Sequence, residues 1–198
     1  ILPALSDDEA IEVTAIHSVA GALNEIIITT PPFRAPHHTS SYVSLVGGGA
    51  TLRPGEVTLA HRGVLFMDEF PEFDRRSVEA LREPLENREI TVARAAGSAT
   101  FPANIMLIAA MNPPGPKADQ REVMRFNRKL SGAIVDRIDL WIEVPLVPHE
   151  KLSRGGGDSS FNIRDRVQNA RNKMHQRTKG KANSELSSRN IEKVINIS

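Results

Sequence analysis

Cysteine is absent from the 198 residues of this sequence, which excludes disulfides and thiolate metal sites. There is also no apolar run of about 18 residues or more, so no transmembrane helix is predicted. The first residues, Ile1-Leu2-Pro3, lack the basic stretch and apolar core of a signal peptide, and they lack an initiating Met. We therefore expect a cytoplasmic protein, of which this sequence is an excised fragment.

Charge is balanced over the whole chain but uneven along it. The 25 Lys and Arg against 24 Asp and Glu give a net charge of +1. Between Lys151 and Lys181, however, nine basic residues are accompanied only by Asp158 and Asp165. Such a run indicates either a solvated helical face or a patch that binds nucleic acid, and charge alone favours the solvated face.

Three apolar segments predict strands. Val64–Met67 is a continuous apolar run that ends abruptly in acidic residues, the pattern of a strand buried on both faces. Ile105–Ala110 is a second apolar run, and Ile138–Val144 alternates enough to predict a strand nearer the sheet edge. Helical patterns lie between these segments, and a Ser6–Glu9 capping box opens the first of them. The alternation predicts an α/β fold with a largely parallel sheet flanked by helices.

The pattern changes near residue 152. The stretch Gly155–Ser160 is typical of a linker, which we place at residues 153–160. Beyond it, apolar residues recur at helical spacing from Ile163 to Met174, which predicts part of a small helical lid at residues 161–198. Residues 1–152 then form the α/β core.

Two adjacent acids follow the first apolar strand. In an open parallel sheet, ligands gather at the carboxyl ends of the strands, where Asp68 and Glu69 are expected to lie. Asp68 could hold Mg²⁺, usually through water, and Glu69 could polarise an attacking water, as in the Walker B arrangement of nucleotide hydrolases. Acids also end strands without any function, so the pair alone leaves both interpretations open.

Asn112 ends the second apolar strand in a similar way. Its neutral amide could orient a water molecule and contact a γ-phosphate oxygen without adding negative charge. The alternative is a turn-forming Asn before Pro113. If one phosphate site uses both strand ends, Asp68, Glu69 and Asn112 must lie side by side.

Arg137 is predicted at a corner between a helix and a strand. It could pair structurally with Asp136 or Asp139, or it could reach across a subunit interface as an arginine finger. Sequence spacing does not separate these two roles.

Three histidines raise the question of a metal site. His37 and His38 are adjacent, but neighbouring histidines in a strand point to opposite sides and rarely bind one ion. A loop or core role is therefore favoured for them and for His61.

Several long runs together resemble the magnesium-chelatase-like AAA+ family, specifically its ComM type. The resemblance covers residues 1–152 well and the predicted lid less sharply. The runs that carry it are Phe33–Ser41, Leu45–Gly49, Arg53–Glu69, Leu81–Glu86, Ala109–Pro113 and Asp136–Leu140. Such collinear matches are far more specific than a single short motif.

The resemblance implies a P-loop NTPase-like fold that binds and hydrolyses ATP with Mg²⁺ at the interfaces of a ring, usually a hexamer. Asp68 and Glu69 match the Walker B pair of this family. Asn112 matches its sensor-1 position, and Arg137 matches its arginine finger.

The resemblance also bears on the partner. A hairpin around residues 93–99 is similar to the presensor-1 insertion of this clade, and Arg94 near its tip is the preferred candidate for contacting DNA. ComM-like proteins are DNA-directed motors that act in the recombination of incoming DNA. Chelatase subunits use the same kind of ATPase core to drive metal insertion into porphyrin. Both kinds of motor therefore stay open, and the DNA-directed motor is preferred.

Three departures from the family pattern matter. No Gly-x-x-x-x-Gly-Lys-Ser/Thr motif occurs in the sequence, and the family's P-loop is expected just before Ile1. The second sensor arginine is expected beyond Ser198. The loop that is usually rich in cysteine is here Pro113–Lys117. We expect the fragment by itself to be inactive, and a non-catalytic AAA+-like interaction module is the remaining alternative.

Overall fold

The structure is a computed structural model. It describes residues 1–49, 52–94, 97–115, 117–130, 132–146, 157–178, 182–183 and 186. The chain divides into a compact unit, Ala4–Glu143, and a second unit made of Ile1–Pro3 and Val144–Ser198. None of the described helices is long and apolar enough to cross a membrane.

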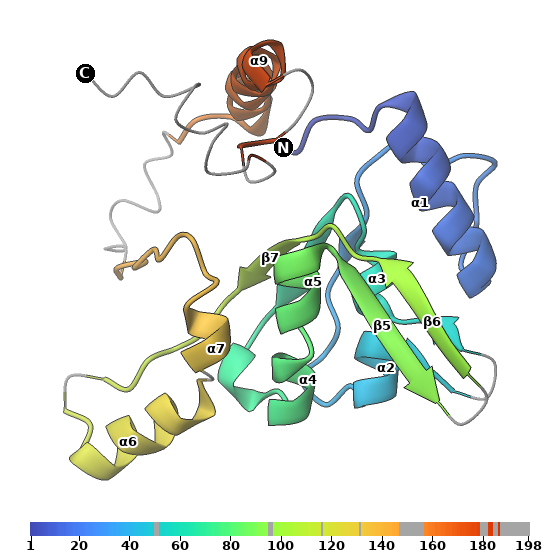
Figure 1. The fold of residues 1–198 in the computed structure, drawn as a ribbon. Coiled ribbons are helices and arrows are strands. Elements are labelled where there is room, and N and C mark those ends of the chain that lie inside the picture. The colour runs from blue at the N-terminus through green and yellow to red at the C-terminus, as the bar shows by residue number, and fades with distance from the viewer. Residues whose placement is uncertain are drawn as a thin grey trace. The chain divides into compact units, whose positions relative to one another are not determined.

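A three-stranded parallel sheet organises the larger unit (Figure 1). Its strands are β1 (Phe33–Arg34), β4 (Val64–Met67) and β7 (Met106–Ala109), in the order β1-β4-β7. β4 is the central strand, and the side chains of Leu65 and Met67 are fully buried, as the continuous apolar run predicts. The expected parallel sheet flanked by helices is confirmed.

The predicted third strand, Ile138–Val144, is wrong. Residues 138–146 have no regular structure, and Leu140 and Ile142 are 79% and 80% exposed. A strand forms only where its backbone groups find a partner strand. None of the described strands pairs with this segment, and β7 is left as an edge of the described sheet.

The chain crosses from β1 to β4 through two short helices and a small ribbon. These elements are α2 (Tyr42–Val46), β2 (Gly47–Gly48), β3 (Arg53–Pro54) and α3 (Glu56–Leu59). β2 and β3 pair antiparallel at very close range. A Cβ on Gly47 would lie 2.6 Å from the carbonyl oxygen of Arg53, and Gly47 has a φ of +106°, so this crossing requires glycine.

The chain crosses from β4 to β7 through three short helices and a hairpin. After β4 come the 3₁₀ helix η1 (Phe70–Glu72), α4 (Arg75–Glu79) and α5 (Arg82–Asn87). The predicted hairpin follows as β5 (Glu89–Arg94) and β6 (Gly97–Pro102), and it is confirmed by antiparallel pairing. Ile90 and Val92 of β5 are buried in the same core as β4, so the hairpin packs on the sheet unit through one face.

The first helix, α1 (Asp7–Ala20), begins at the capping box that its sequence predicts. Ser6 and Glu9 form the capping box in both directions. Gly21 caps the other end with a φ of +70°, in the left-handed region that glycine tolerates. The buried Val13 and His17 face the rest of the unit, where α1 packs on α3 and β3.

The last helices of the larger unit are α6 (Gln120–Lys129) and α7 (Gly132–Val135). In the second unit, α9 (Ser160–Thr178) is the helix predicted for the lid. Its exposed basic residues include Arg164 and Lys173. Of the predicted linker and lid, residues 153–156, 179–181, 184–185 and 187–198 lie outside the described residues.

Candidate active site

The ends of β4 and β7 bring the predicted polar residues to one edge of the sheet. Met67 is the register partner of Ala109. Beyond the strands, the N–H of Ala110 donates to Met67 O at 2.9 Å, and the N–H of Phe70 donates to Ala110 O at 2.9 Å. Asp68 and Glu69 therefore leave β4 beside the backbone that leads to Asn112. The two strand ends are adjacent, as the sequence predicts. The side-by-side placement of Asn112 with Asp68 and Glu69, and the roles of the three residues, stay predictions.

Glu69 adopts an uncommon backbone conformation. Its φ of 51° and ψ of 43° lie in the left-handed region, which costs a residue with a side chain about 1–2 kcal/mol. Asp68 Oδ1 accepts a hydrogen bond from the N–H of Glu69 at 2.9 Å. Both side chains are exposed at this sharp turn.

His38 contacts the Glu69 carboxylate, which sequence reasoning did not anticipate. The distance from His38 Nδ1 to Glu69 Oε2 is 2.9 Å, and the side chains are 27% and 58% exposed. His37 and His38 follow β1 in a loop, where their rings are tilted by 34° to one another with centroids 4.1 Å apart. Among the described residues, no group of three or more His, Cys, Asp or Glu could hold a metal ion.

Asn112 is exposed and lines a shallow pocket of about 340 Å³ beside α6. Arg125 and Lys129 of α6 also line it. Lys129 Nζ lies 2.6 Å from Glu72 Oε1, and its ammonium lowers the pKa of the Glu72 carboxyl. The pocket thus combines the Asn112 amide with two cationic side chains and the Glu122 carboxylate.

Arg137 pairs with neither of the acids that the sequence offered. Its guanidinium forms an ion pair with Glu86 of α5 and donates from Nη1 to Ala133 O at 2.7 Å. Its Nε is buried and has no hydrogen-bond partner among the described atoms. Within this chain, Arg137 is held by Glu86, a partner about 50 residues earlier that spacing arguments could not single out.

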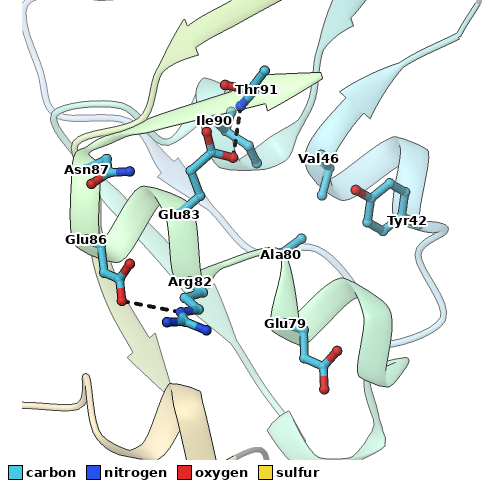
Figure 2. Close-up of a pocket in the computed structure, with 10 residues that line it drawn as sticks. All are labelled: Tyr42, Val46, Glu79, Ala80, Arg82, Glu83, Glu86, Asn87, Ile90 and Thr91. Carbon is cyan, nitrogen blue, oxygen red and sulfur yellow. Dashed lines mark hydrogen bonds and ion pairs between the residues drawn. The ribbon is translucent and has the colours of Figure 1, made fainter. Parts of the chain in front are cut away.

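Glu86 belongs to an acidic groove of about 380 Å³ along α5 (Figure 2). Figure 2 shows Arg82 directed at Glu86, with Nε 3.3 Å from Oε1. Glu83 accepts a hydrogen bond from the N–H of Thr91 at 3.1 Å. These carboxylates therefore have structural partners. Glu83 links α5 to β5, and Glu86 links α5 to Arg137.

Arg94, the predicted DNA contact, is the last residue of β5 and pairs with Gly97. It therefore lies near the tip of the hairpin, as predicted. Its side chain and residues 95–96 fall outside what the structure describes, so its contact with DNA stays a prediction.

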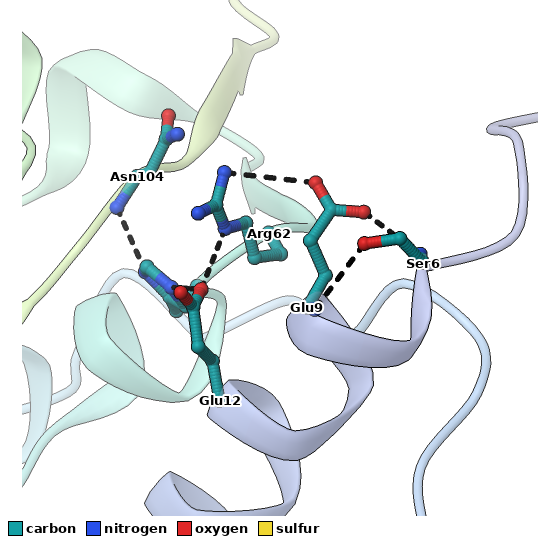
Figure 3. A network of polar contacts seen from close by, with 6 residues as sticks. Ser6, Glu9, Glu12, Arg62 and Asn104 are labelled. Carbon is teal, nitrogen blue, oxygen red and sulfur yellow. Dashed lines mark hydrogen bonds and ion pairs between the residues drawn. The ribbon is translucent and has the colours of Figure 1, made fainter. Parts of the chain in front are cut away.

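A polar network fixes α1 to the loop before β4 (Figure 3). Arg62 Nε donates to Glu12 Oε2 at 2.9 Å, and Arg62 Nη1 lies 3.6 Å from Glu9 Oε1. The hydrogen bond from Arg62 lowers the pKa of the Glu12 carboxyl. The network places α1 on the same loop that leads into the strand carrying the two acids.

His61 is the buried member of this network and is 4% exposed. Its Nδ1 accepts a hydrogen bond from the N–H of Asn104 at 3.0 Å, so its proton resides on Nε2, which lies 3.2 Å from Glu12 Oε2. Burial lowers the pKa of the imidazole, and the contact with Glu12 offsets this only in part. His61 has a core role, one of the two that the sequence favoured.

The parallel sheet, flanked by helices and carrying acids at the end of its central strand, has the P-loop NTPase-like architecture of AAA+ proteins. A model of the family described as magnesium chelatase, subunit ChlI, matches residues 1–152. The chain belongs to this family, which confirms the resemblance seen in the sequence.

Individual relatives agree with this assignment. The competence protein ComM of Haemophilus influenzae is 43% identical over 98% of this chain and 40% of its own length. YifB of Escherichia coli is 42% identical over 96% of this chain and 40% of its own length. The DNA replication licensing factor mcm6 of Schizosaccharomyces pombe is 33% identical over 54% of this chain and 12% of its own. The chain thus spans about two fifths of the length of ComM and YifB.

Proposed function

We propose that this chain is the catalytic core of an ATP-hydrolysing AAA+ motor that works as a hexameric ring on DNA. The observation that carries the proposal is the shared edge of β4 and β7, where Asp68 and Glu69 directly follow β4 and Asn112 follows β7 by three residues. Ligands of parallel sheets bind at this edge. The 198 residues alone contain no P-loop motif, so hydrolysis is proposed for the protein at its relatives' full length.

The donor set at this edge fits Mg²⁺ and a nucleotide. Mg²⁺ prefers carboxylate and water oxygens and usually binds through one or two carboxylates together with phosphates. Asp68 is exposed at the strand end and supplies such a carboxylate. When bound, the ion neutralises charge on the phosphates. Glu69 accepts the proton of the attacking water, and Asn112 orients that water beside the γ-phosphate.

Arg137 completes the proposal as an arginine finger for a neighbouring subunit. Its ion pair with Glu86 is compatible with this role, because a guanidinium has five N–H donors and one carboxylate does not use them all. Glu86 then holds Arg137 at the corner that follows α7. In the ring, Arg137 stabilises the charge of phosphoryl transfer in the adjacent site.

DNA is the proposed partner for two reasons. The relatives named above include a competence protein and a DNA replication factor. The hairpin β5–β6 is also anchored in the core by the buried Ile90 and Val92, and Arg94 stands at the tip end of β5. A basic residue at such a tip can neutralise a phosphate, which makes binding depend on salt.

The DNA proposal is tested by the salt dependence of binding and by the effect of DNA on ATP hydrolysis. For the full-length protein, replacing Arg94 with Ala should reduce the log–log salt slope by about 1 and weaken the stimulation of hydrolysis by DNA. Replacing Lys179 and Lys181 in the predicted lid is the control and should matter less.

The chelatase-type motor gives a different result in the same assays. If the full-length protein hydrolyses ATP but shows neither salt-sensitive DNA binding nor stimulation by DNA, a motor that drives metal insertion through a protein partner replaces the DNA motor. If it binds no ATP and hydrolyses none, the non-catalytic interaction module replaces both.

A further inference from the structure

The helix α6 carries a row of arginines along one side. Arg121, Arg125 and Arg128 are four and three residues apart, a spacing that places them on one face of a helix. All three residues are exposed, and no residue of α6 is buried. The helix extends from the larger unit beside α7 (Figure 1). These three residues, the arginine row, therefore lie on the outer surface of that unit.

The arginine row has no ion pair and no side-chain hydrogen bond within the part of the chain that the structure describes. The remaining cation of α6, Lys129, pairs with Glu72. The two acids at the start of the helix form its capping box, in which Asp119 and Glu122 each accept a hydrogen bond from the backbone N–H of the other. These acids hold the first turn together and leave the row unpaired.

The charge pattern of α6 differs from that of two other helices of the same unit. In α4, Arg75 forms an ion pair with Glu79, four residues further on. In α5, Arg82 pairs with Glu86 at the same spacing. The residue four positions after Arg121 is another arginine, and like charges at this spacing destabilise a helix. Arg121 also lies in the first turn of α6, where the helix dipole disfavours a cation.

An anion outside the chain explains a row of charges that the helix itself disfavours. A guanidinium binds phosphate through two parallel hydrogen bonds, which an ammonium does not offer. Successive members of the row are about 4.5–6 Å apart along the helix axis, so the row presents one cation per turn. A nucleic-acid backbone presents single negative charges at regular intervals along its length. The row fits such a backbone without any contact to the bases.

We propose that the arginine row of α6 binds the phosphate backbone of DNA, in addition to the contact proposed for the tip of the β5–β6 hairpin. The choice of DNA as the partner rests on the proposed function, but the contact requires no ATP hydrolysis. Phosphate contacts carry no sequence information and release counterions, so binding weakens as the salt concentration rises. Each arginine that neutralises a phosphate of a duplex contributes about 0.9 to the log–log salt slope.

Three double variants of the full-length protein test the row. Arg121→Gln with Arg125→Gln removes two of its charges, and Arg121→Lys with Arg125→Lys keeps them. Arg75→Gln with Arg166→Gln is the matched control, because it removes two exposed arginines that already pair with acids. The measured quantities are the Kd for a labelled DNA duplex at a series of salt concentrations, by fluorescence anisotropy, and the thermal unfolding midpoint.

The Gln pair at positions 121 and 125 should lower the salt slope by about 2 and raise the Kd about tenfold or more. The Lys pair should keep the slope of the unsubstituted protein, and the control pair should change it by less than about 0.5. An unchanged slope in the folded Gln pair overturns the proposal. An equal loss in the control pair also overturns it, since the total charge of the protein would then explain the effect.

Two further measurements separate this proposal from its alternatives. Binding of a labelled poly-glutamate peptide that is lost in the Gln pair, with DNA binding intact, would assign the row to an acidic protein partner instead. If the unsubstituted protein binds no DNA at any salt concentration, the DNA-directed function fails and this contact falls with it. If DNA binding depends on Arg94 but not on the row, the contact on α6 alone fails.

Discussion

At the residue scale, the sequence alone indicates the two acids at the strand end, but it does not indicate which side chains contact them. An apolar run that stops at two acids is a local signal, so Asp68 and Glu69 could be predicted from the sequence alone. His38 is 31 positions away from Glu69, and only the register of β1 on β4 joins them. Arg137 and Glu86 illustrate the same limit, since the nearest acids along the chain, Asp136 and Asp139, are not the partners that the structure shows.

His61 gives a prediction on pH and stability. Its pKa is lowered by burial, so the unfolded chain, with a His pKa of about 6.5, binds more protons than the folded one as the pH drops. The free energy of unfolding should therefore fall as the pH decreases from about 6.5 through the folded pKa. Protonation of Nδ1 would also break its hydrogen bond with the N–H of Asn104.

The measurement is the urea midpoint at a series of pH values between about 7.5 and 5. A His61→Asn variant is the control, because it removes the titrating group while keeping a polar side chain. It should be less stable at high pH and lose less stability on acidification. Equal pH dependence in both proteins would show that other groups control this range.

At the element scale, short-range sequence patterns predicted the helices, strands and turns that depend mainly on neighbouring residues. The capping box, the buried strand β4 and the hairpin around Gly97 all follow from short-range signals. Ile138–Val144 has the composition of a strand, but pairing decides whether a strand forms, and composition says nothing about an available partner edge. The parallel sheet could therefore be predicted as a class, while its number of strands could not.

Gly63, just before β4, packs closely against Pro32, just before β1. This close approach gives a second prediction. A Cβ added to Gly63 would lie 2.0 Å from the carbonyl oxygen of Pro32, which belongs to the backbone and cannot turn away. Gly63→Ala should therefore lower the free energy of unfolding by about 2–4 kcal/mol. Gly115→Ala is the matched control, because a Cβ there meets nothing within 4 Å, and its effect should stay within about 0.5 kcal/mol.

Chemical denaturation of the two variants beside the unsubstituted protein decides this prediction. If Gly63→Ala and Gly115→Ala have the same midpoint, the close approach of Gly63 to Pro32 is not a constraint on the fold. A fall in ATP hydrolysis by Gly63→Ala is also expected, since the shift would disturb the register of β1 on β4, the strand that leads to Asp68 and Glu69.

At the scale of the whole molecule, this chain spans about two fifths of the length of ComM and YifB, so the tests of the proposed ring use the protein at its relatives' full length. The proposed ring supplies one missing part, because an arginine finger acts on the site of its neighbour. Arg137→Ala in the full-length protein should suppress hydrolysis while the Kd for ATP changes little.

Mixed rings distinguish action in trans from a structural role. Combining Arg137→Ala subunits with Glu69→Gln subunits should restore part of the activity, because some interfaces then pair an intact finger with an intact acid. Subunit exchange must be demonstrated, for instance by mass spectrometry of differently tagged subunits. No recovery in rings that do exchange would assign Arg137 to its ion pair with Glu86 alone.

The most direct test of the ATPase proposal is a comparison of ATP binding and ATP hydrolysis in the full-length Glu69→Gln protein. Gln keeps the size of the side chain and can still contact His38, but it cannot accept the proton of the attacking water. The predicted result is a Kd for ATP within about threefold of the unsubstituted protein and a kcat lowered by about 100-fold or more. Glu72→Gln, an exposed acid three residues away that pairs with Lys129, should leave both constants unchanged. Hydrolysis by Glu69→Gln at the normal rate would contradict the assignment of the strand-end site.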